Sequence, residues 1–316
     1  MVNCKLPREV EICEVAPRDG FQAESKWIPT DDKIRIINEL AKTGIRSMEI
    51  TSFVHPKAIP NLKDAEEVIN RTRDLTNMKF RALVPNLIGA ERAVTVGITK
   101  LKLMLSATDS HSMSNANCTV EEAQRSQEKL ISFAYNHNVQ VSGSISVAFG
   151  CPYEGIVPIS KLSSIVKRYV DSGITEISLA DTTGMGNPKQ VIGILEALKG
   201  EFPTCEFSMH FHNTRGLALA NVLASLQQNI VKFDSSIAGL GGCPYAPGAS
   251  GNIATEDLVY ALESIGIDTG VNLDSIIDAA KFTKKIIGHD GGSYLIKAGR
   301  TSRLELKPGS QKKIEE

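Results

Sequence analysis

The sequence predicts an α/β fold in one domain, a (β/α)8 barrel. The chain has 316 residues, a length that a barrel of about 250 residues with an extension accommodates. Short apolar stretches alternate with longer ones whose apolar residues recur at helical spacing. The alternation repeats eight times along the chain. An open, doubly wound sheet is the main alternative, but eight units favour closure because a closed barrel has no exposed strand edges.

The first half of the chain contains four strand–helix units. The expected strands are 10–15, 46–51, 78–84 and 100–106, and the expected helices are 31–43, 61–73, 87–96 and 120–136. The last of these helices begins after Thr119, with Glu122 three residues on, which is the pattern of a capping box. The segment between residue 106 and this helix is expected to be a long polar loop.

The second half repeats the pattern and adds a C-terminal extension. The expected strands are 139–147, 174–179, 206–211 and 232–237, and the expected helices are 159–171, 188–199, 217–228 and 255–265. A last helix, 273–287, and a polar tail from His289 follow. We therefore expect a TIM-barrel domain at 1–290 and a C-terminal tail at 291–316, either loosely held or packed on a neighbouring subunit.

Composition gives no reason to expect a nucleic-acid or membrane partner. The net charge is -1, which offers no general attraction to polyanions. The sequence contains no apolar run of about 18 residues, the length that a transmembrane helix needs. The six cysteines are far apart, and no export signal precedes them, so they are expected to be reduced. We expect a cytoplasmic protein.

Unusual polar residues lie where the first two strands end, which is where barrels of this class place their active sites. Arg18 and Asp19 follow the first strand, and Glu49 lies near the end of the second. An unpaired carboxylate inside a barrel is costly, so Glu49 needs a partner, and Arg18 on the adjacent strand end is the nearest candidate. The alternatives are a surface ion pair for Arg18 and Asp19 and an outward-facing Glu49.

Two histidines share one face of the seventh strand. His210 and His212 are two residues apart, and side chains in a strand alternate between its faces. Two imidazoles at the functional end of a strand suit a metal ion, although buried histidines bonded to backbone carbonyls would give the same pattern. The remaining histidines are expected on solvated surfaces: His55, His111, His137 and His289.

A glycine-rich segment, 238–252, follows the eighth strand. Glycine tolerates positive φ and close backbone approach, so the segment suits an irregular loop that folds over a ligand. A long connection without a role is the alternative. Cys243 has Gly242 before it and Pro244 after it, away from any apolar stripe, and is predicted to be a functional thiol. Asn252 stands at the end of this segment.

Two further strand ends carry weaker indications. Asp181 ends the sixth strand, where it could accept hydrogen bonds that support the site or simply cap a helix. Cys151 lies after the fifth strand and is interpreted as structural. The sequence has neither a Gly-x-Gly-x-x-Gly turn between strand and helix nor a Walker-type phosphate loop, so a nucleotide-binding fold is not supported.

Together these residues resemble the 3-hydroxy-3-methylglutaryl-CoA lyase family, over residues 9 to 285. The resemblance is carried by Pro-Arg-Asp-Gly-Phe-Gln at 17–22, Glu-Ile-Thr-Ser-Phe-Val at 49–54, Pro-Asn-Leu at 85–87, Gly-Cys-Pro-Tyr-Glu-Gly at 150–155, His-Phe-His-Asn-Thr-Arg-Gly at 210–216, Gly-Leu-Gly-Gly-Cys-Pro-Tyr-Ala at 239–246 and Ala-Ser-Gly-Asn-Ile-Ala-Thr-Glu-Asp-Leu-Val-Tyr at 249–260. The cysteine loop is the most family-specific of these motifs, since Arg-Asp-Gly is shared with a wider superfamily of barrel metalloenzymes.

The resemblance implies a set of site residues and a cofactor. Its ligands for a divalent ion, Mg²⁺ or Mn²⁺, would be Asp19, His210, His212 and Asn252. It implies catalytic roles for Arg18, which would hold the thioester oxygen, for Glu49, which would orient Arg18, and for Cys243, which would transfer a proton. Arg18 and Gln22 would bind substrate. The expected partner is an acyl-CoA, and the expected assembly is a homodimer or a higher homo-oligomer.

The reaction that the resemblance implies is retro-Claisen cleavage of 3-hydroxy-3-methylglutaryl-CoA to acetyl-CoA and acetoacetate. The chain departs from the usual family pattern in a few places, which leaves the acyl group open: Phe21, Ala180, Asn213 and Arg215. Three alternatives remain. They are a citramalyl-CoA lyase that gives acetyl-CoA and pyruvate, a Claisen-type acyl-CoA synthase, and a barrel that only binds acyl-CoA.

Overall fold

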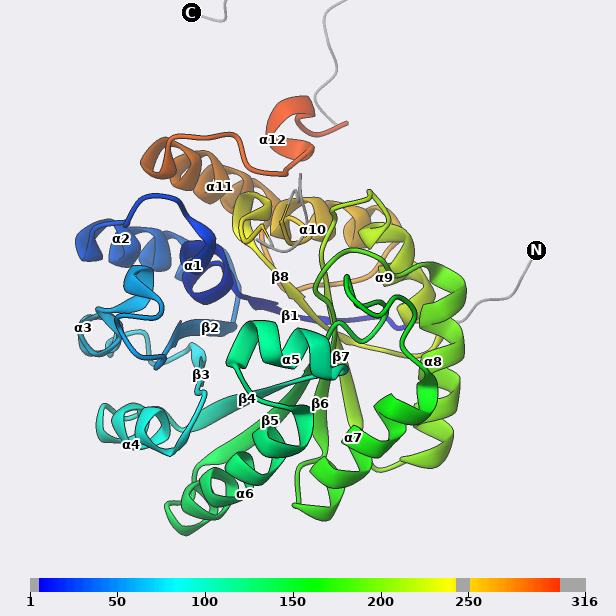
Figure 1. Ribbon diagram of the computed structural model, residues 1–316. Coiled ribbons are helices and arrows are strands. Elements are labelled where there is room, and N and C mark those ends of the chain that lie inside the picture. Colours follow the sequence, from blue (N-terminus) through cyan, green and yellow to red (C-terminus); the bar gives the residue numbers. More distant parts are fainter. Residues whose placement is uncertain (1–5, 243–250, 302–316) are drawn as a thin grey trace, which may run out of the picture.

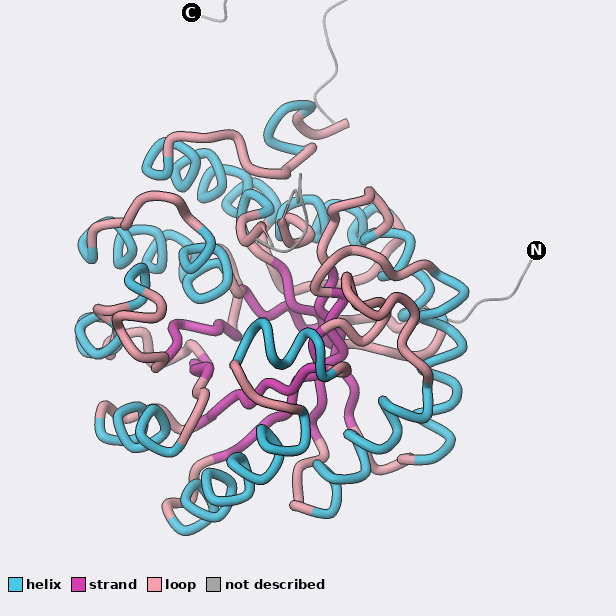
Figure 2. Tube along the Cα trace, viewed as in Figure 1, coloured by secondary structure: helices cyan, strands magenta, loops and turns pink. Residues whose placement is uncertain are grey.

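The computed structural model describes residues 6–242 and 251–301. Eight parallel strands pair in sequence order and β8 pairs with β1, which closes the barrel (Figure 1). Helices surround the strands on the outside (Figure 2). The predicted (β/α)8 barrel is therefore confirmed, and the open sheet is excluded.

The elements follow one another in the predicted order. The strands are β1 Glu11–Glu14, β2 Ser47–Ser52, β3 Lys79–Leu83, β4 Lys100–Ser106, β5 Gln140–Ser146, β6 Glu176–Asp181, β7 Glu206–Phe211 and β8 Lys232–Ser235. The helices are α1 Phe21–Ala23, α2 Thr30–Ala41, α3 Ala65–Arg71, α4 Leu87–Thr95, α5 Asp109–Ala116, α6 Val120–Asn136, α7 Ile159–Asp171, α8 Pro188–Glu201, α9 Ala218–Gln227, α10 Thr255–Ser264, α11 Leu273–Ile287 and α12 Leu295–Ala298. Short helical turns span Ala16–Gly20, Pro60–Leu62 and Ile237–Gly239.

Several boundaries agree with the sequence to the residue, namely those of β4, β7, α6, α7 and α11. The start of α6 shows why. The Thr119 hydroxyl accepts a hydrogen bond from the Glu122 amide at 3.2 Å, and the Glu122 carboxylate accepts one from the Thr119 amide at 2.8 Å. This reciprocal pair satisfies two amides that would otherwise lack partners at the helix N-terminus, which confirms the capping box.

The predicted polar loop after β4 is wrong, because its residues form α5, which lies in front of the strand ends in Figure 1. Contacts outside the helix hold it. The Glu154 carboxylate accepts a hydrogen bond from the Ser110 amide at 3.1 Å, and the Asp109 carboxylate accepts one from the Val120 amide at 2.8 Å. Tertiary contacts of this kind override a composition with little apolar periodicity.

Three smaller expectations also need correction. The helix expected at 61–73 is a turn, Pro60–Leu62, followed by α3. The segment 238–252, expected to lack regular structure, begins inside the turn Ile237–Gly239. The tail contains α12, whose start is tied to α10 because the Asp257 carboxylate accepts the amides of Tyr294 and Leu295 at 2.9 and 2.8 Å. This part of the tail is thus packed on its own domain. The division at residue 290 itself stays a prediction.

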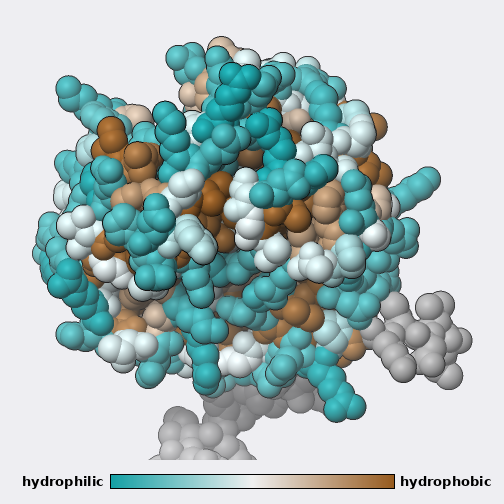
Figure 3. Space-filling view, turned by 90° about the horizontal axis from the view of Figure 1, so that it is seen from below, coloured by the Kyte–Doolittle hydropathy of each residue, from teal (hydrophilic) through white to brown (hydrophobic). Residues whose placement is uncertain are grey.

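The apolar core lies between the strands and the surrounding helices, while several inward-facing strand residues are charged. The surface in Figure 3 is mostly hydrophilic, with separate hydrophobic patches. Among the described residues, no helix is both long and apolar enough to cross a bilayer. Charged side chains therefore lie inside the barrel as well as on its surface.

Candidate functional site

A carboxylate and two imidazoles meet at the carboxyl ends of the strands. The Nε2 atoms of His210 and His212 are 3.1 Å apart. The Asp19 carboxylate lies 3.9 Å from the first and 3.7 Å from the second. One ligand atom from each of the three residues falls within 4.8 Å of the others, a grouping that could hold a metal ion.

Local backbone structure explains how these side chains come together. His210 lies on β7 and His212 follows its end, so both point to the inside of the barrel, as the alternation predicts. Asp19 belongs to the turn Ala16–Gly20, which begins two residues after β1 and carries the carboxylate over the strand ends. The sequence predicted that Asp19, His210 and His212 lie at one end of the barrel, and the structure confirms this position.

Asn252 completes the group. Its amide nitrogen donates to the Asp19 carboxylate at 2.6 Å and to the Leu240 carbonyl at 2.9 Å. Its side-chain oxygen is buried and has no hydrogen-bond partner. An isolated β-bridge joins residue 252 to His212. The amide oxygen, an acceptor without a donor, is thus held beside Asp19 and the histidines.

Arg18 and Glu49 form the second half of the site. The Arg18 guanidinium is paired with the carboxylates of both Glu49 and Asp19, and Glu49 is fully buried. The predicted pairing of Arg18 with Glu49 is confirmed, so Glu49 does not face outward and Arg18 does not form a surface pair. Arg18 therefore links the cluster of Asp19, His210 and His212 to Glu49 in the barrel interior.

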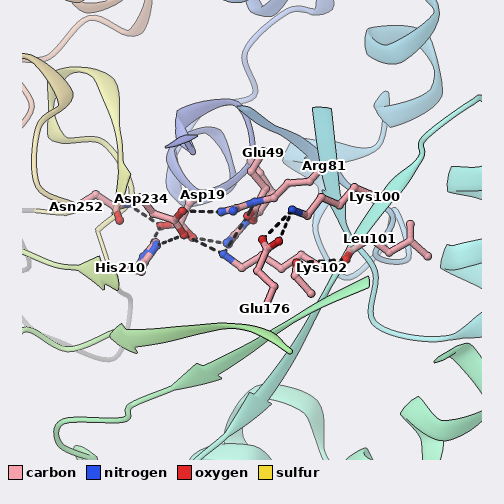
Figure 4. A network of polar contacts seen from close by, with 12 residues as sticks. Asp19, Glu49, Arg81, Lys100, Leu101, Lys102, Glu176, His210, Asp234 and Asn252 are labelled. Carbon is pink, nitrogen blue, oxygen red and sulfur yellow. Dashed lines mark hydrogen bonds and ion pairs between the residues drawn. The ribbon is translucent and has the colours of Figure 1, made fainter. Parts of the chain in front are cut away.

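Three charged residues that the sequence analysis missed lie beneath this pair: Arg81 on β3, Lys102 on β4 and Asp234 on β8 (Figure 4). Arg81 donates to Glu49 at 2.8 Å and to Asp234 at 2.7 Å. Lys102 lies 3.1 Å from Glu49 and 2.9 Å from Asp234. Arg81 and Lys102 could have been noticed in the sequence, since each is a charged residue between two apolar neighbours in a predicted strand. Asp234 stands between Phe233 and Ser235 and is less conspicuous.

Charge pairing sets the ionisation of these groups. Burial alone would raise the pKa of Glu49, but Arg18, Lys102 and Arg81 lower it below the usual range. Burial likewise opposes ionisation of Asp234, yet Arg81 and Lys102 hold its pKa well below the ordinary value. Burial, followed by the neighbouring His210, lowers the pKa of His212 to about 4. The carboxylates are therefore ionised at neutral pH, and the His212 imidazole is neutral.

Other predicted residues have mixed outcomes. Gln22, on α1, is half-buried, and its side-chain oxygen has no hydrogen-bond partner. Asp181 accepts the amides of Met185 and Gly186 at 2.9 and 3.0 Å, and burial raises its pKa to about 6. Cys151 is buried and accepts a hydrogen bond from the Thr108 hydroxyl at 3.0 Å, as a structural thiol would.

The expectation of solvated surface positions is wrong for His111, because α5 packs it inward, where its Nδ1 lies 2.8 Å from the Ser106 hydroxyl. The other three histidines of that group are exposed, as predicted: His55, His137 and His289. None of these four belongs to the cluster of Asp19, His210 and His212.

The glycine-rich segment begins against the site. Gly241 has a φ of +99°, and a Cβ there would meet the Asn252 amide and lie 2.9 Å from the Asp19 carboxylate. Only glycine therefore fits where this backbone passes the cluster. Cys243, the predicted functional thiol, is two residues further on and lies outside the described residues.

The donor set fits a divalent cation. The Asp234 carboxylate lies 3.2 Å from His210 Nδ1 and can only accept there, so Nδ1 is the donor and Nε2 is the atom that faces Asp19 and His212. The Nε2 atoms of two imidazoles, one carboxylate and an unpartnered amide oxygen therefore face one another. A carboxylate and an amide oxygen favour hard ions, whereas zinc sites more often include thiolate.

Comparison with known proteins places this arrangement in a family. The HMGL-like family model matches residues 9–283. The chain belongs to the HMGL-like family. Curated relatives are named hydroxymethylglutaryl-CoA lyase. The chain is 46% identical to the YngG protein of Bacillus subtilis, over 89% of this chain and 94% of that protein. It is 43% identical to a cytoplasmic protein of Rattus norvegicus, over 95% of this chain and 88% of that protein.

A mitochondrial relative from Arabidopsis thaliana is longer. It is 46% identical over 91% of this chain, and the match spans 62% of that protein. The chain therefore covers less than two thirds of this relative, although it covers most of the bacterial and rat family members.

Solved structures of the family have the same fold. An HMG-CoA lyase of Acinetobacter baumannii, in complex with coenzyme A and 3-methylmalate, superposes with a TM-score of 0.91 at 43% identity, over 95% of this chain and 98% of that one. The Bacillus subtilis HMG-CoA lyase gives a TM-score of 0.90 at 44% identity, over 93% and 98%. These similarities cover the whole barrel rather than one motif.

Proposed function

We propose that this chain is a metal-dependent carbon–carbon lyase that cleaves 3-hydroxy-3-methylglutaryl-CoA to acetyl-CoA and acetoacetate. The observation that carries the proposal is the convergence of Asp19, His210 and His212 beside Arg18 at the carboxyl end of the barrel. The names of the family relatives support the same activity.

The residues proposed to hold the ion are Asp19, His210, His212 and Asn252, and the proposed ion is Mg²⁺ or Mn²⁺. The unpartnered amide oxygen of Asn252 and the neutral His212 imidazole support this set. When bound, the ion supplies Lewis-acid chemistry that lowers the pKa of a substrate hydroxyl.

The protein groups around it can carry the remaining steps. Asp19, ionised and beside the histidines, is placed to take the proton of the C3 hydroxyl. As the C2–C3 bond breaks, its electron pair passes to C2 and forms the enolate of acetyl-CoA, while C3 becomes the ketone carbon of acetoacetate. Arg18 donates to the thioester oxygen on which negative charge develops, and Glu49 holds the guanidinium in place. Gln22, with its free oxygen, is proposed to contact substrate.

Cys243 is proposed to return a proton to C2 of the enolate. Its support is the sequence setting on the glycine-rich segment, whose start at Gly241 passes directly over Asp19. Replacing Cys243 with Ser should leave metal and substrate binding intact but remove most turnover, since a hydroxyl of much higher pKa exchanges protons less readily. Cys118→Ser serves as the control, because Cys118 lies in the α5–α6 connection.

Alkylation of Cys243, mapped by peptide mass spectrometry, should fall when a substrate analogue is bound. If the analogue does not change the labelling and the Cys243→Ser enzyme is active, another residue must be the proton donor.

The proposed partner is an acyl-CoA, with no role for nucleic acid or membrane. A homodimer or higher homo-oligomer and a cytoplasmic location are kept as predictions. Light scattering after gel filtration and localisation of a tagged chain test them.

Product analysis tests the proposed activity. Purified protein with Mg²⁺ or Mn²⁺ is incubated separately with 3-hydroxy-3-methylglutaryl-CoA and citramalyl-CoA, and the acids are identified by mass spectrometry. We expect acetoacetate and acetyl-CoA from the first ester, and none after the metal is chelated. Pyruvate as the main product would favour citramalyl-CoA, and condensation of acetyl-CoA with a keto acid as the only activity would favour a synthase. Tight binding of both esters without turnover would indicate a protein that only binds acyl-CoA.

A further inference from the structure

A buried ion network lies below the site, and of its residues only Glu49 has a part in the reaction proposed above. It consists of Glu49, Arg81, Lys102 and Asp234, with side chains from four strands that meet inside the barrel (Figure 4). All four are at most 7% exposed, so their charges are shielded from water and depend on one another. Such a network is expensive to build, which raises the question of what it positions.

Strand register fixes both ends of the network. Glu49 and Arg81 are direct partners across β2 and β3. His210 and Asp234 are direct partners across β7 and β8. Arg81 and Lys102 then join Glu49 to Asp234 across the interior. Each carboxylate in this way contacts both cations and also one residue of the site, Arg18 for Glu49 and His210 for Asp234.

The same oxygen of Asp234 serves two partners. Oδ2 lies 3.2 Å from His210 Nδ1 and 2.9 Å from Lys102 Nζ. The ammonium therefore holds the oxygen that orients the imidazole. Among these side chains and the adjacent Asp19, the acidic groups are Glu49, Asp234 and Asp19, and the basic groups are Arg18, Arg81 and Lys102. Three of each sign balance without any exposed counter-ion.

We propose that Asp234 is a positioning residue that orients His210 toward the metal, and that Arg81 and Lys102 tie it to Glu49, so that the metal-binding and Arg18 sides of the site share one geometry. This inference rests on the proposed metal site. Asp234 and Lys102 act through His210 and do not touch substrate.

Metal affinity is the readout, measured by titrating metal-free protein with Mn²⁺ and following free Mn²⁺ by electron paramagnetic resonance. Asp234→Asn should weaken Mn²⁺ binding by roughly 10- to 100-fold, the usual cost of removing the partner of a metal-binding histidine. At saturating Mn²⁺, most of the kcat should return, because Asp234 acts on the occupancy and orientation of His210 rather than on substrate. Unchanged affinity in Asp234→Asn would overturn the proposal.

Lys102→Met separates positioning from simple charge. Removing a cation close to the site should strengthen Mn²⁺ binding if Lys102 acts only through its field. If Lys102 holds Asp234 in place, binding should instead weaken, by about tenfold, within the range for such supporting residues. Stronger or unchanged binding in Lys102→Met would therefore contradict the proposed role of Lys102.

Lys100→Met is the matched control. Lys100 lies on the same strand and is paired with Glu176 at 2.7 Å, but it does not contact Asp234. Its loss should leave the Mn²⁺ affinity unchanged, and an equal fall in both lysine variants would reduce the effect to general loss of barrel packing.

If either single variant does not fold, the double variant Asp234→Asn, Lys102→Met keeps the network's charge balance, and the same titration is made on it. Weakened Mn²⁺ binding supports the proposal, and wild-type affinity overturns it. These outcomes are distinct from those of the activity assay. A wild-type protein that binds Mn²⁺ but yields no acetoacetate would refute the proposed function, and the Mn²⁺ affinities of the variants could still be compared.

Discussion

Two pairs of buried carboxylates lie within the same barrel, and their pKa values are shifted in opposite directions. Glu49 and Asp234 are 0% and 2% exposed, and Glu14 and Glu256 are both 0% exposed. The pKa values of the first pair are lowered by Arg18, Arg81 and Lys102. Burial raises the pKa of Glu14 to about 7 and that of Glu256 to about 8. All four carboxylates are buried, so the opposite directions of their pKa shifts come from the groups that each one contacts.

The partners of the second pair are neutral. Glu14 accepts the amides of Ala16 and Ile237 at 2.8 and 2.9 Å, and the Thr255 hydroxyl at 2.7 Å. Glu256 accepts the Ala238 amide at 3.2 Å. These bonds join the ends of β1 and β8 to the start of α10, below the glycine-rich segment. The ionised region thus surrounds the proposed chemistry, and the neutral region ties Ile237 and Ala238 to β1 and α10.

The comparison predicts its largest effect for Asp19, where the ionised region meets the metal site. Asp19→Ala removes a proposed ligand and a partner of Arg18, so kcat should fall roughly 10³-fold or more, corresponding to the several kcal/mol that a metal supplies. Steady-state kinetics with Mn²⁺ measures it, with the exposed Asp31→Ala as control. An Asp19→Ala enzyme with near wild-type turnover would place the chemistry elsewhere.

Arg18 should come second. Arg18→Lys keeps the positive charge but loses the planar fork that contacts Glu49 and Asp19 together. The kcat should fall on the order of 10²-fold, the cost of one donor to a developing oxyanion, while the fold persists by circular dichroism. Arg35→Lys, at an exposed pair with Asp32, is the matched control. Near wild-type turnover in Arg18→Lys would mean that another group stabilises the charge.

Substitutions in the neutral region should change the free energy of unfolding rather than kcat. The pKa of Glu256 in the folded chain, about 8, lies above its ordinary value of 4.5. Its contribution to stability is therefore complete below pH 4.5 and is lost as pH rises toward 8. Glu256→Gln lacks this loss, so its free energy of unfolding relative to the wild type should rise by about 2 kcal/mol between pH 5 and pH 7.

Urea unfolding at both pH values measures the difference, with the exposed Glu263→Gln on the same helix as control. A pH-independent difference between Glu256→Gln and the wild type would show that Glu256 is ionised in the fold, like Glu49.

The sequence predicted the residues whose positions follow from strand alternation. His210 and His212 share a face because they are two residues apart, and Arg18, Asp19 and Glu49 fall at strand ends, where barrels place their sites. Asn252 came from the family resemblance alone. Its place beside Asp19 depends on the return of the chain after the glycine-rich segment, which no local pattern encodes.

The sequence could not predict the network of Arg81, Lys102 and Asp234. Their pairing joins strands far apart in the chain, since Asp234 is 153 residues from Arg81 and 132 residues from Lys102. Nor does the sequence predict that the pKa of Glu49 is lowered and that of Glu256 is raised, since the partners that decide this come from distant parts of the chain. α5 was missed for a related reason, because contacts with Glu154 and Val120 hold it, rather than its own periodicity.

The proposed function requires that His210 and its neighbours bind a divalent ion in the ionised region. Mn²⁺ titration of metal-free wild-type protein and of His210→Ala tests it most directly, with His137→Ala as the matched control on the surface of the barrel. We predict one Mn²⁺ per chain for the wild type and for His137→Ala, and no measurable binding at this site for His210→Ala. Full Mn²⁺ occupancy in His210→Ala would show that His210 is not a ligand and that the ion binds elsewhere.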